Sequence, residues 1–314
     1  MKIPICLVTG FLGAGKTTVL KNIVARYRNR RLVYLINEFS SKDVDGAVIL
    51  DSAADVVSVF GGSIFCKCLV TQFIAKLQEM PRIYPDIEGL VIEASGMADP
   101  RVIEAMLVET RMDQIYALST ILAVVDPGSY MKLRHTLPNV IAQVQSADRI
   151  ILNKIDLYDE TLLRETELSL RSVNPAGEVL RTTRGAINYD IFSRHSEGMR
   201  GLVGEYALCK DPNYSSETVD FADEVDLRVL EKTIIEWKDD LYRVKGFVSS
   251  CGKHYYVDYS GVGVSIGEVE VKPRDLSLAI IYKGGSKKHF GGMKGLGLML
   301  PRGDKAAKAE FLPA

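Results

Sequence analysis

The strongest constraint on the fold is a glycine-rich loop that directly follows an apolar run near the start of the chain. Residues 10–18 read Gly-Phe-Leu-Gly-Ala-Gly-Lys-Thr-Thr, a G-x-x-x-x-G-K-T pattern, and they come after Ile3–Val8. The apolar run predicts a strand, and Thr17–Arg28 is typical of a helix. Glycines let the connecting chain curl tightly, because they adopt backbone conformations that other residues avoid. We therefore predict a strand–loop–helix unit whose loop encloses a polyphosphate.

This loop supplies the donors that a triphosphate needs. Backbone N–H groups of a curled loop and the N-terminus of the following helix point toward the anion. Lys16 would reach the β- and γ-phosphates, and the Thr17 hydroxyl would ligate Mg²⁺. The alternative is a glycine-rich turn with a chance Lys-Thr pair, which the flanking strand and helix disfavour. The expected phosphate-binding residues are Gly10, Gly13, Ala14, Gly15, Lys16, Thr17 and Thr18.

A second motif places a carboxylate at the end of another apolar run. The strand-like residues 89–92 lead into Glu93, and Gly96 follows three residues later. Nucleotide-binding proteins with this loop hold an acid there for the Mg²⁺ shell. Glu93 is one methylene longer than aspartate, so it would act through a metal-bound water, while the Gly96 N–H could sense the γ-phosphate. The alternative is a buried strand that ends in a surface glutamate. The candidate catalytic residues are Lys16, Thr17 and Glu93.

A third motif, Asn153-Lys154-Ile155-Asp156, follows the apolar run Ile150–Leu152. A carboxylate at Asp156 can accept hydrogen bonds from N1–H and the 2-amino group of guanine. Adenine has a lone pair at N1 and no 2-amino group, so the same carboxylate would repel it. Lys154 can lie along the base plane, and Asn153 can brace the loop. The three motifs together predict GTP, rather than ATP, as the nucleotide.

Length and composition narrow the class of protein. The 314 residues suggest about two domains, and 47% hydrophobic with 25% charged residues is ordinary for a globular protein. A formal net charge of −1 argues against a nucleic-acid partner. Neither an apolar stretch of transmembrane length nor a signal-peptide pattern is present, and five cysteines do not form a disulfide framework. We expect a cytoplasmic protein without a membrane partner.

Strand-like and helix-like runs alternate along the first two thirds of the chain, which predicts an α/β fold: a mostly parallel sheet covered by helices on both faces. The expected strands are Ile3–Val8, Leu32–Ile36, Val56–Phe60, Leu90–Ile92, Thr120–Val125 and Ile150–Leu152. The expected helices are Thr17–Arg28, Leu69–Met80, Pro100–Thr110, Asn139–Ala147 and Glu160–Val173. Ligands of such sheets bind at the carboxyl ends of the strands, where the three motifs fall.

The rest of the chain changes character. The turn-rich, polar residues 209–226 predict a linker between a nucleotide-binding domain at 1–208 and a smaller α+β domain at 227–283. In the smaller domain we expect one helix, Leu227–Trp237, whose apolar stripe is core, and four strands. Those strands are Gly246–Ser250, His254–Tyr259, Val262–Val271 and Leu278–Tyr282. The glycine- and lysine-rich residues 284–314 predict a solvated tail, and the alternative is an anion-binding arm.

Together these motifs resemble the CobW-like P-loop GTPases, a family related to the GTPases that mature urease and hydrogenase. The resemblance rests on residues 10–18, Ile36–Phe39, Glu93–Pro100, Asn153–Asp156 and Arg243–Phe247, and extends from about residue 3 to about residue 283. It implies a P-loop GTPase domain and a CobW-like C-terminal domain. It further implies slow GTP hydrolysis and a role in delivering metal ions or installing metal cofactors such as cobalamin.

One departure from the family pattern concerns the metal. The family has Gly-Cys-x-Cys-Cys where this chain has Gly-Gly-Ser-Ile-Phe-Cys-Lys-Cys at 61–68, so Ser63 and Phe65 replace two cysteines. Cys66 matches the pattern and Cys68 is an additional thiol; the resemblance suggests Glu38 as a third ligand. Tight binding of Zn²⁺, Co²⁺ or Ni²⁺ needs three or four ligands. The alternative is that both thiols are packing residues of a loop without metal.

These observations lead to a leading hypothesis and two competitors. In the leading hypothesis, segments near Asn37–Asp45 and Ser95–Pro100 respond to the γ-phosphate, and the switch delivers a metal to a client metalloprotein or cofactor-assembly protein. Since the sequence shows no obvious residue to position the attacking water, slow turnover is expected unless a partner or a nucleotide-dependent homodimer completes the site. The competitors are a metal-free, GTP-gated docking protein and a small-molecule kinase.

Overall fold

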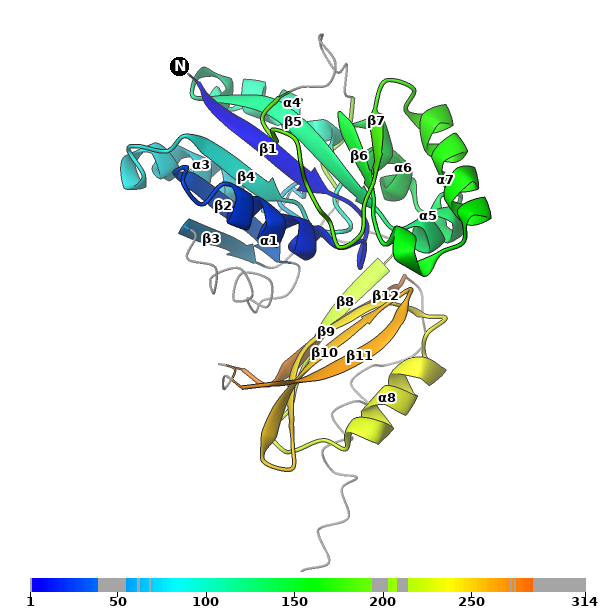
Figure 1. The fold of residues 1–314 in the computed structure, drawn as a ribbon. Coiled ribbons are helices and arrows are strands. Elements are labelled where there is room, and N and C mark those ends of the chain that lie inside the picture. The colour runs from blue at the N-terminus through cyan, green and yellow to red at the C-terminus, as the bar shows by residue number, and fades with distance from the viewer. Residues whose placement is uncertain are drawn as a thin grey trace, which may run out of the picture. The chain divides into compact units, whose positions relative to one another are not determined.

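The computed structural model describes residues 2–38, 55–60, 63–67, 69–193, 203–207, 214–270, 273 and 275–284 (Figure 1). The chain divides into two compact units, Met1–Asn213 and Tyr214–Ala314. Several sequence expectations fall outside the described residues: Cys68, most of the segment at 37–45, and the tail from 285. Within the described part, no helix is long and apolar enough to cross a membrane.

A seven-stranded sheet forms the centre of the first unit, in the order β3-β2-β4-β1-β5-β6-β7. Every neighbouring pair is parallel. The strands are β1 (Ile3–Thr9), β2 (Leu32–Glu38), β3 (Asp55–Phe60), β4 (Gly89–Glu93), β5 (Tyr116–Val125), β6 (Arg149–Leu152) and β7 (Glu178–Arg181). The predicted α/β class is confirmed. Because the strands are parallel, the carboxyl ends of β4, β1, β5 and β6 lie along one edge of the sheet.

Helices follow most of these strands, as expected for parallel connections. They are α1 (Lys16–Arg26), α3 (Val70–Ile83), α4 (Ile103–Glu109), α5 (Pro127–Leu133), α6 (Pro138–Gln145) and α7 (Glu160–Val173), with one-turn 3₁₀ segments at Pro100–Val102, Met112–Gln114 and Ile155–Leu157. Aspartates begin two of the helices: the Asp126 carboxylate accepts from Ser129 N, and Asp159 accepts from Leu162 N. Helix α5 and strand β7 were not expected from the sequence.

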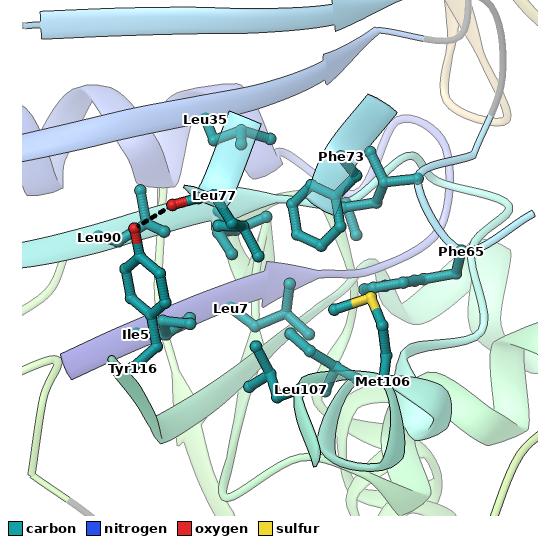
Figure 2. Close-up of a cluster of buried hydrophobic side chains, with 14 of the residues drawn as sticks. Ile5, Leu7, Leu35, Phe65, Phe73, Leu77, Leu90, Met106, Leu107 and Tyr116 are labelled. Carbon is teal, nitrogen blue, oxygen red and sulfur yellow. Dashed lines mark hydrogen bonds between the residues drawn. The ribbon is translucent and has the colours of Figure 1, made fainter. Parts of the chain in front are cut away.

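The side chains of β1 alternate between two cores, one on each face of the sheet. Ile5 and Leu7 pack with Phe73 and Leu77 of α3, whereas Cys6 and Val8 pack with α1. Figure 2 shows the first core, in which Tyr116 donates its hydroxyl to the carbonyl of Leu77 at 2.8 Å. Burial on both faces explains why these strands are apolar almost throughout.

The second unit has one antiparallel five-stranded sheet, in the order β11-β10-β9-β12-β8. Its elements are β8 (Tyr214–Asp220), α8 (Leu227–Glu236), β9 (Leu241–Ser250), β10 (Lys253–Ser260), β11 (Gly263–Val269) and β12 (Ser277–Lys283). Leu230 and Ile234 of α8 are fully buried in a core with residues of this sheet. The apolar stripe of α8 is therefore core.

Strand β8 corrects the expectation of a linker over 209–226. Residues 214–220 pair antiparallel with β12 along their whole length, from Tyr214 opposite Lys283 to Asp220 opposite Ser277. The sequence of β8 is largely polar because it is an edge strand, and only some of its side chains contact the core. Pairing with β12 stabilises β8, although the sequence of β8 lacks the apolar alternation typical of a strand.

Candidate nucleotide-binding site

The phosphate loop (residues 10–17) connects β1 to α1 through three glycines with positive φ angles: Gly10 at 138°, Gly13 at 77° and Gly15 at 105°. Two of these positions also have no room for a side chain. A Cβ on Gly10 would lie 2.2 Å from the carbonyl oxygen of Val124, and one on Gly15 would lie 2.3 Å from Nδ2 of Asn153. The loop thus folds against β5 and the Asn153 segment in a way that glycine alone permits.

Replacing Gly10 by alanine should lower the free energy of unfolding by about 3 kcal/mol, since both the φ angle and the contact with the rigid Val124 backbone oppose a Cβ. Gly263→Ala is the matched control, because Gly263 has a similar φ of 143° but nothing within 4 Å of its added Cβ. That control should cost about 1 kcal/mol. Urea unfolding measures both, and equal losses would contradict the close approach at Gly10.

Lys16 begins α1 with a side chain that is folded back over the phosphate loop. Its Nζ donates to the carbonyls of Gly10 at 2.9 Å and Phe11 at 3.3 Å, and the residue is buried. Thr17 is half-buried and Thr18 is exposed. The ammonium is therefore held within the loop that would surround a phosphate, where it can neutralise the anion.

Glu93 lies at the end of β4, buried at 4% exposure, opposite Val8 of β1 and Ile36 of β2. The chain that follows, here called the β4 loop (residues 94–99), touches the phosphate loop directly. A Cβ on Gly96 would lie 2.8 Å from the backbone nitrogen of Leu12. The β4 loop and the phosphate loop are thus in contact, so a group bound in one can shift the other.

Helix α6 holds the other side of the β4 loop. The buried amide of Gln143 donates to the carbonyls of Gly96 and Ala98, each at 3.1 Å, and Asn139 donates to the carbonyl of Met97 at 2.6 Å. Three consecutive carbonyls are thereby fixed by side chains. The sequence analysis did not find these residues, since glutamine and asparagine in a helix give no signal of what they bond.

The Asn153 loop (residues 153–157) lies beside the phosphate loop. Asn153 is buried; its amide donates to the carbonyl of Ala14 at 2.9 Å, and its oxygen accepts from Gly185 N at 2.9 Å. Asp156 is exposed in the short 3₁₀ segment that follows. One side chain therefore ties the phosphate loop, the Asn153 loop and the chain after β7 together.

Two further groups at this edge were missed by the sequence analysis. The first is Asp126 at the end of β5, whose buried carboxylate pairs with Lys154 Nζ at 2.9 Å and accepts from the Tyr158 hydroxyl at 2.9 Å. Burial and the neighbouring Asp126 raise the pKa of Tyr158, so its hydroxyl stays protonated and donates. Asp126 thus fixes the ammonium of Lys154, the second residue of the Asn153 loop.

The second missed group is the turn at 182–186 that follows β7. Asn22 of α1 donates to the carbonyls of Arg184 and Gly185, both at 2.8 Å, and a Cβ on Gly185 would lie 2.7 Å from the Val19 side chain. The turn therefore packs against both α1 and Asn153. The sequence did carry a signal for each missed group. Asp-Pro at 126–127 follows a strand and marks the first group, and Thr-Thr-Arg-Gly at 182–185 marks the second.

The cysteine loop (residues 63–67) is a compact, buried turn. Cys66 is 5% exposed, its backbone N–H donates to the Ser63 carbonyl at 2.9 Å, and Phe65 packs edge-on against Phe73. Lys67 N donates to the carbonyl of Ala207 at 3.1 Å, and Ala207 N donates to that of Phe65 at 3.0 Å. The backbone of this loop is therefore held by its own turn and by two hydrogen bonds with Ala207.

Among the described residues, no three histidine, cysteine or acidic side chains come together as metal ligands. Cys66 is the one member of the expected set that can be placed, because Cys68 lies outside the described part and Glu38 is described in its backbone alone, at the end of β2. Cys6 is fully buried in the core, which raises its thiol pKa, and Cys251 is exposed in a turn. The expected ligand set of Cys66, Cys68 and Glu38 stays a prediction.

Comparison with known proteins shows which family this chain resembles. A zinc chaperone, YjiA of Escherichia coli, is 29% identical over 275 residues, covering 83% of this chain and 86% of its own. The zinc chaperone CobW of Pseudomonas aeruginosa is 25% identical, covering 83% and 81%. The Zn(II)-bound YjiA GTPase structure aligns over 90% of this chain and 94% of its own, at 23% identity and a TM-score of 0.48. The model of the family described as CobW/HypB/UreG, nucleotide-binding domain, matches residues 4–181, so the chain belongs to this family.

Proposed function

We propose that this protein binds GTP with Mg²⁺, hydrolyses it slowly, and uses the nucleotide to control delivery of a metal ion, with Zn²⁺ favoured over Co²⁺ and Ni²⁺. The bridge made by Asn153 between Ala14 and Gly185 is the observation that supports GTP best. It fixes the Asn153 loop, which carries the exposed carboxylate of Asp156, against the loop suited to phosphates. Guanine presents two donors to such a carboxylate, whereas adenine presents a lone pair.

In this proposal each part of the site has a separate task. The phosphate-loop amides and the Lys16 ammonium bind the phosphates, and the Gly96 N–H faces the γ-phosphate. Bound Mg²⁺, held by Thr17 and through water by Glu93, would neutralise charge on the β- and γ-phosphates. The Gln143 amide is used to hold the carbonyls of Gly96 and Ala98. Because that amide donates to backbone carbonyls, it does not position the water that attacks the γ-phosphate. Slow GTP hydrolysis is therefore expected.

The metal cargo is inferred from the relatives and from Cys66. Both relatives named above are zinc chaperones, and thiolates are preferred ligands of Zn²⁺. The proposed ligands are Cys66, Cys68 and Glu38, which lie at or after the ends of the neighbouring strands β2 and β3. The recipient would be a client metalloprotein or a protein of metallocofactor assembly, such as cobalamin synthesis. A nucleotide-dependent homodimer would supply the missing water-positioning group.

Zinc titration in the presence of a non-hydrolysable GTP analogue tests the metal proposal. We expect one Zn²⁺ per chain, with stoichiometric uptake lost in the Cys66→Ser, Cys68→Ser double variant, because one remaining ligand of three cannot hold the ion. Cys251→Ser, which removes an exposed thiol in a turn of the second unit, is the control and should bind as the parent does. Unchanged uptake in the double variant would move the site elsewhere.

The burial of Cys66 favours a second candidate, a metal-free GTP-gated docking protein. At 5% exposure its side chain is packed like a core residue, and Ser63 and Phe65 stand where the family has cysteines. In that case the cysteine loop forms part of a contact surface for a client. The same titration separates the candidates, since a docking protein would take up no stoichiometric zinc in either nucleotide state.

A further inference from the structure

Asn37 occupies the end of β2, with β4 on one side of it and β3 on the other. It is 5% exposed, and its side-chain oxygen accepts from two backbone donors: Ile64 N at 2.9 Å and Ser95 N at 3.2 Å. Its amide nitrogen donates to the carbonyl of Val59 at 3.4 Å. One oxygen atom therefore joins the cysteine loop to the β4 loop.

Each of these two loops has a different neighbour. The β4 loop touches the phosphate loop, because Gly96 is packed against the backbone of Leu12. The cysteine loop contains Cys66, two residues after Ile64, and is closed by the bond from Cys66 N to the Ser63 carbonyl. Asn37 thus stands between the segment next to the phosphates and the segment that would hold the metal.

We propose that Asn37 is a positioning residue that transmits the nucleotide state from the β4 loop to the cysteine loop. This proposal rests on the proposed GTP switch and deepens it by naming the residue that connects its two sites. A carboxamide oxygen has two lone pairs in one plane, so it can accept both N–H groups at once. When the γ-phosphate draws Ser95 and Gly96 toward the phosphate loop, the shared oxygen moves or gives up one bond. The position of Ile64, and with it Cys66, changes accordingly.

Hydrogen exchange of the full-length protein, read by mass spectrometry on peptides covering residues 63–67 and 94–98, tests this. In the parent, a non-hydrolysable GTP analogue should slow exchange in both peptides relative to GDP. In Asn37→Ala, the peptide at 94–98 should still respond, whereas the peptide at 63–67 should exchange about tenfold faster and no longer distinguish the nucleotides.

Asn174 offers a matched control. It is also a buried asparagine that ties three backbone groups, donating to Val144 and Ala147 at 2.8 Å and accepting from Gly177 N at 2.9 Å. Asn174→Ala should loosen the fold as much as Asn37→Ala but leave the nucleotide response of both peptides intact. A merely structural role for Asn37 would make the two alanine variants behave alike, which would overturn the proposal.

The parent alone also gives a decisive result. A response at 94–98 without one at 63–67 would overturn the coupling while leaving the GTP switch in place. No response in either peptide would contradict the proposed switch, and the coupling with it. Parallel responses in the parent that Asn37→Ala separates and Asn174→Ala leaves intact would support both.

Discussion

Replacement of Lys16 by alanine is expected to reduce GTP affinity about a thousandfold and to abolish hydrolysis. The ammonium is buried within the phosphate loop, 2.9 Å from the carbonyl of Gly10, so it meets a bound phosphate in surroundings with little water to screen the charge. Removing it leaves the phosphate charge uncompensated at the place where negative charge is greatest. Fluorescent-GTP displacement measures the affinity, and phosphate release measures the hydrolysis.

The matched control is Lys21→Ala, which removes an exposed lysine from the same helix. Net charge and helix propensity change equally in the two variants, so a difference between them reports the position of the charge. The control should bind GTP within about twofold of the parent, since an exposed charge is screened by solvent. Loss of affinity in both variants, or in neither, would contradict the placement of Lys16 in the phosphate site.

Replacement of Asp156 by asparagine is expected to reverse base preference, lowering affinity for GTP about a thousandfold in favour of xanthosine triphosphate. Guanine offers N–H donors at N1 and at the 2-amino group, and the amide NH₂ of asparagine would face the second of these donors. Xanthine has a carbonyl at C2, which can accept a hydrogen bond from that amide. Its N1–H still donates to the side-chain oxygen of the asparagine. A site that loses a required hydrogen bond discriminates by orders of magnitude.

Asp159→Asn serves as the control for this change, because Asp159 lies three residues further along, is exposed, and caps α7 through Leu162 N. Asparagine caps a helix as well as aspartate does, so neither stability nor base preference should change. Competition calorimetry with the two triphosphates measures the preference. If Asp156→Asn retained its preference for GTP, another residue would have to recognise the base.

Much of the site could be predicted from the sequence because it lies at strand ends. β1, β4 and β6 are apolar and end in the Gly10, Glu93 and Asn153 motifs, and parallel strands bring such ends to one edge. The partners that hold the motifs could not be predicted. Asp126 and Gln143 are single polar residues whose roles depend on contacts with distant segments, and such contacts leave no periodic pattern.

The edges of both sheets were harder to predict than their centres. β7 has four residues and is half-buried, and β8 is largely polar, so neither shows the apolar run that marks a central strand. Both strands form because a neighbouring strand offers its unpaired backbone groups. The short helix α5 likewise depends on the Asp126 cap and Pro127 rather than on a long amphipathic pattern.

The most direct test of the GTP assignment is calorimetric titration of the unmodified protein with GTP and ATP, each with Mg²⁺. The carboxylate of Asp156 and the bridge at Asn153 predict micromolar binding of GTP and binding of ATP weaker by at least about a hundredfold. ATP binding as tight as that of GTP would contradict the proposed base recognition and, with it, a GTP-controlled switch.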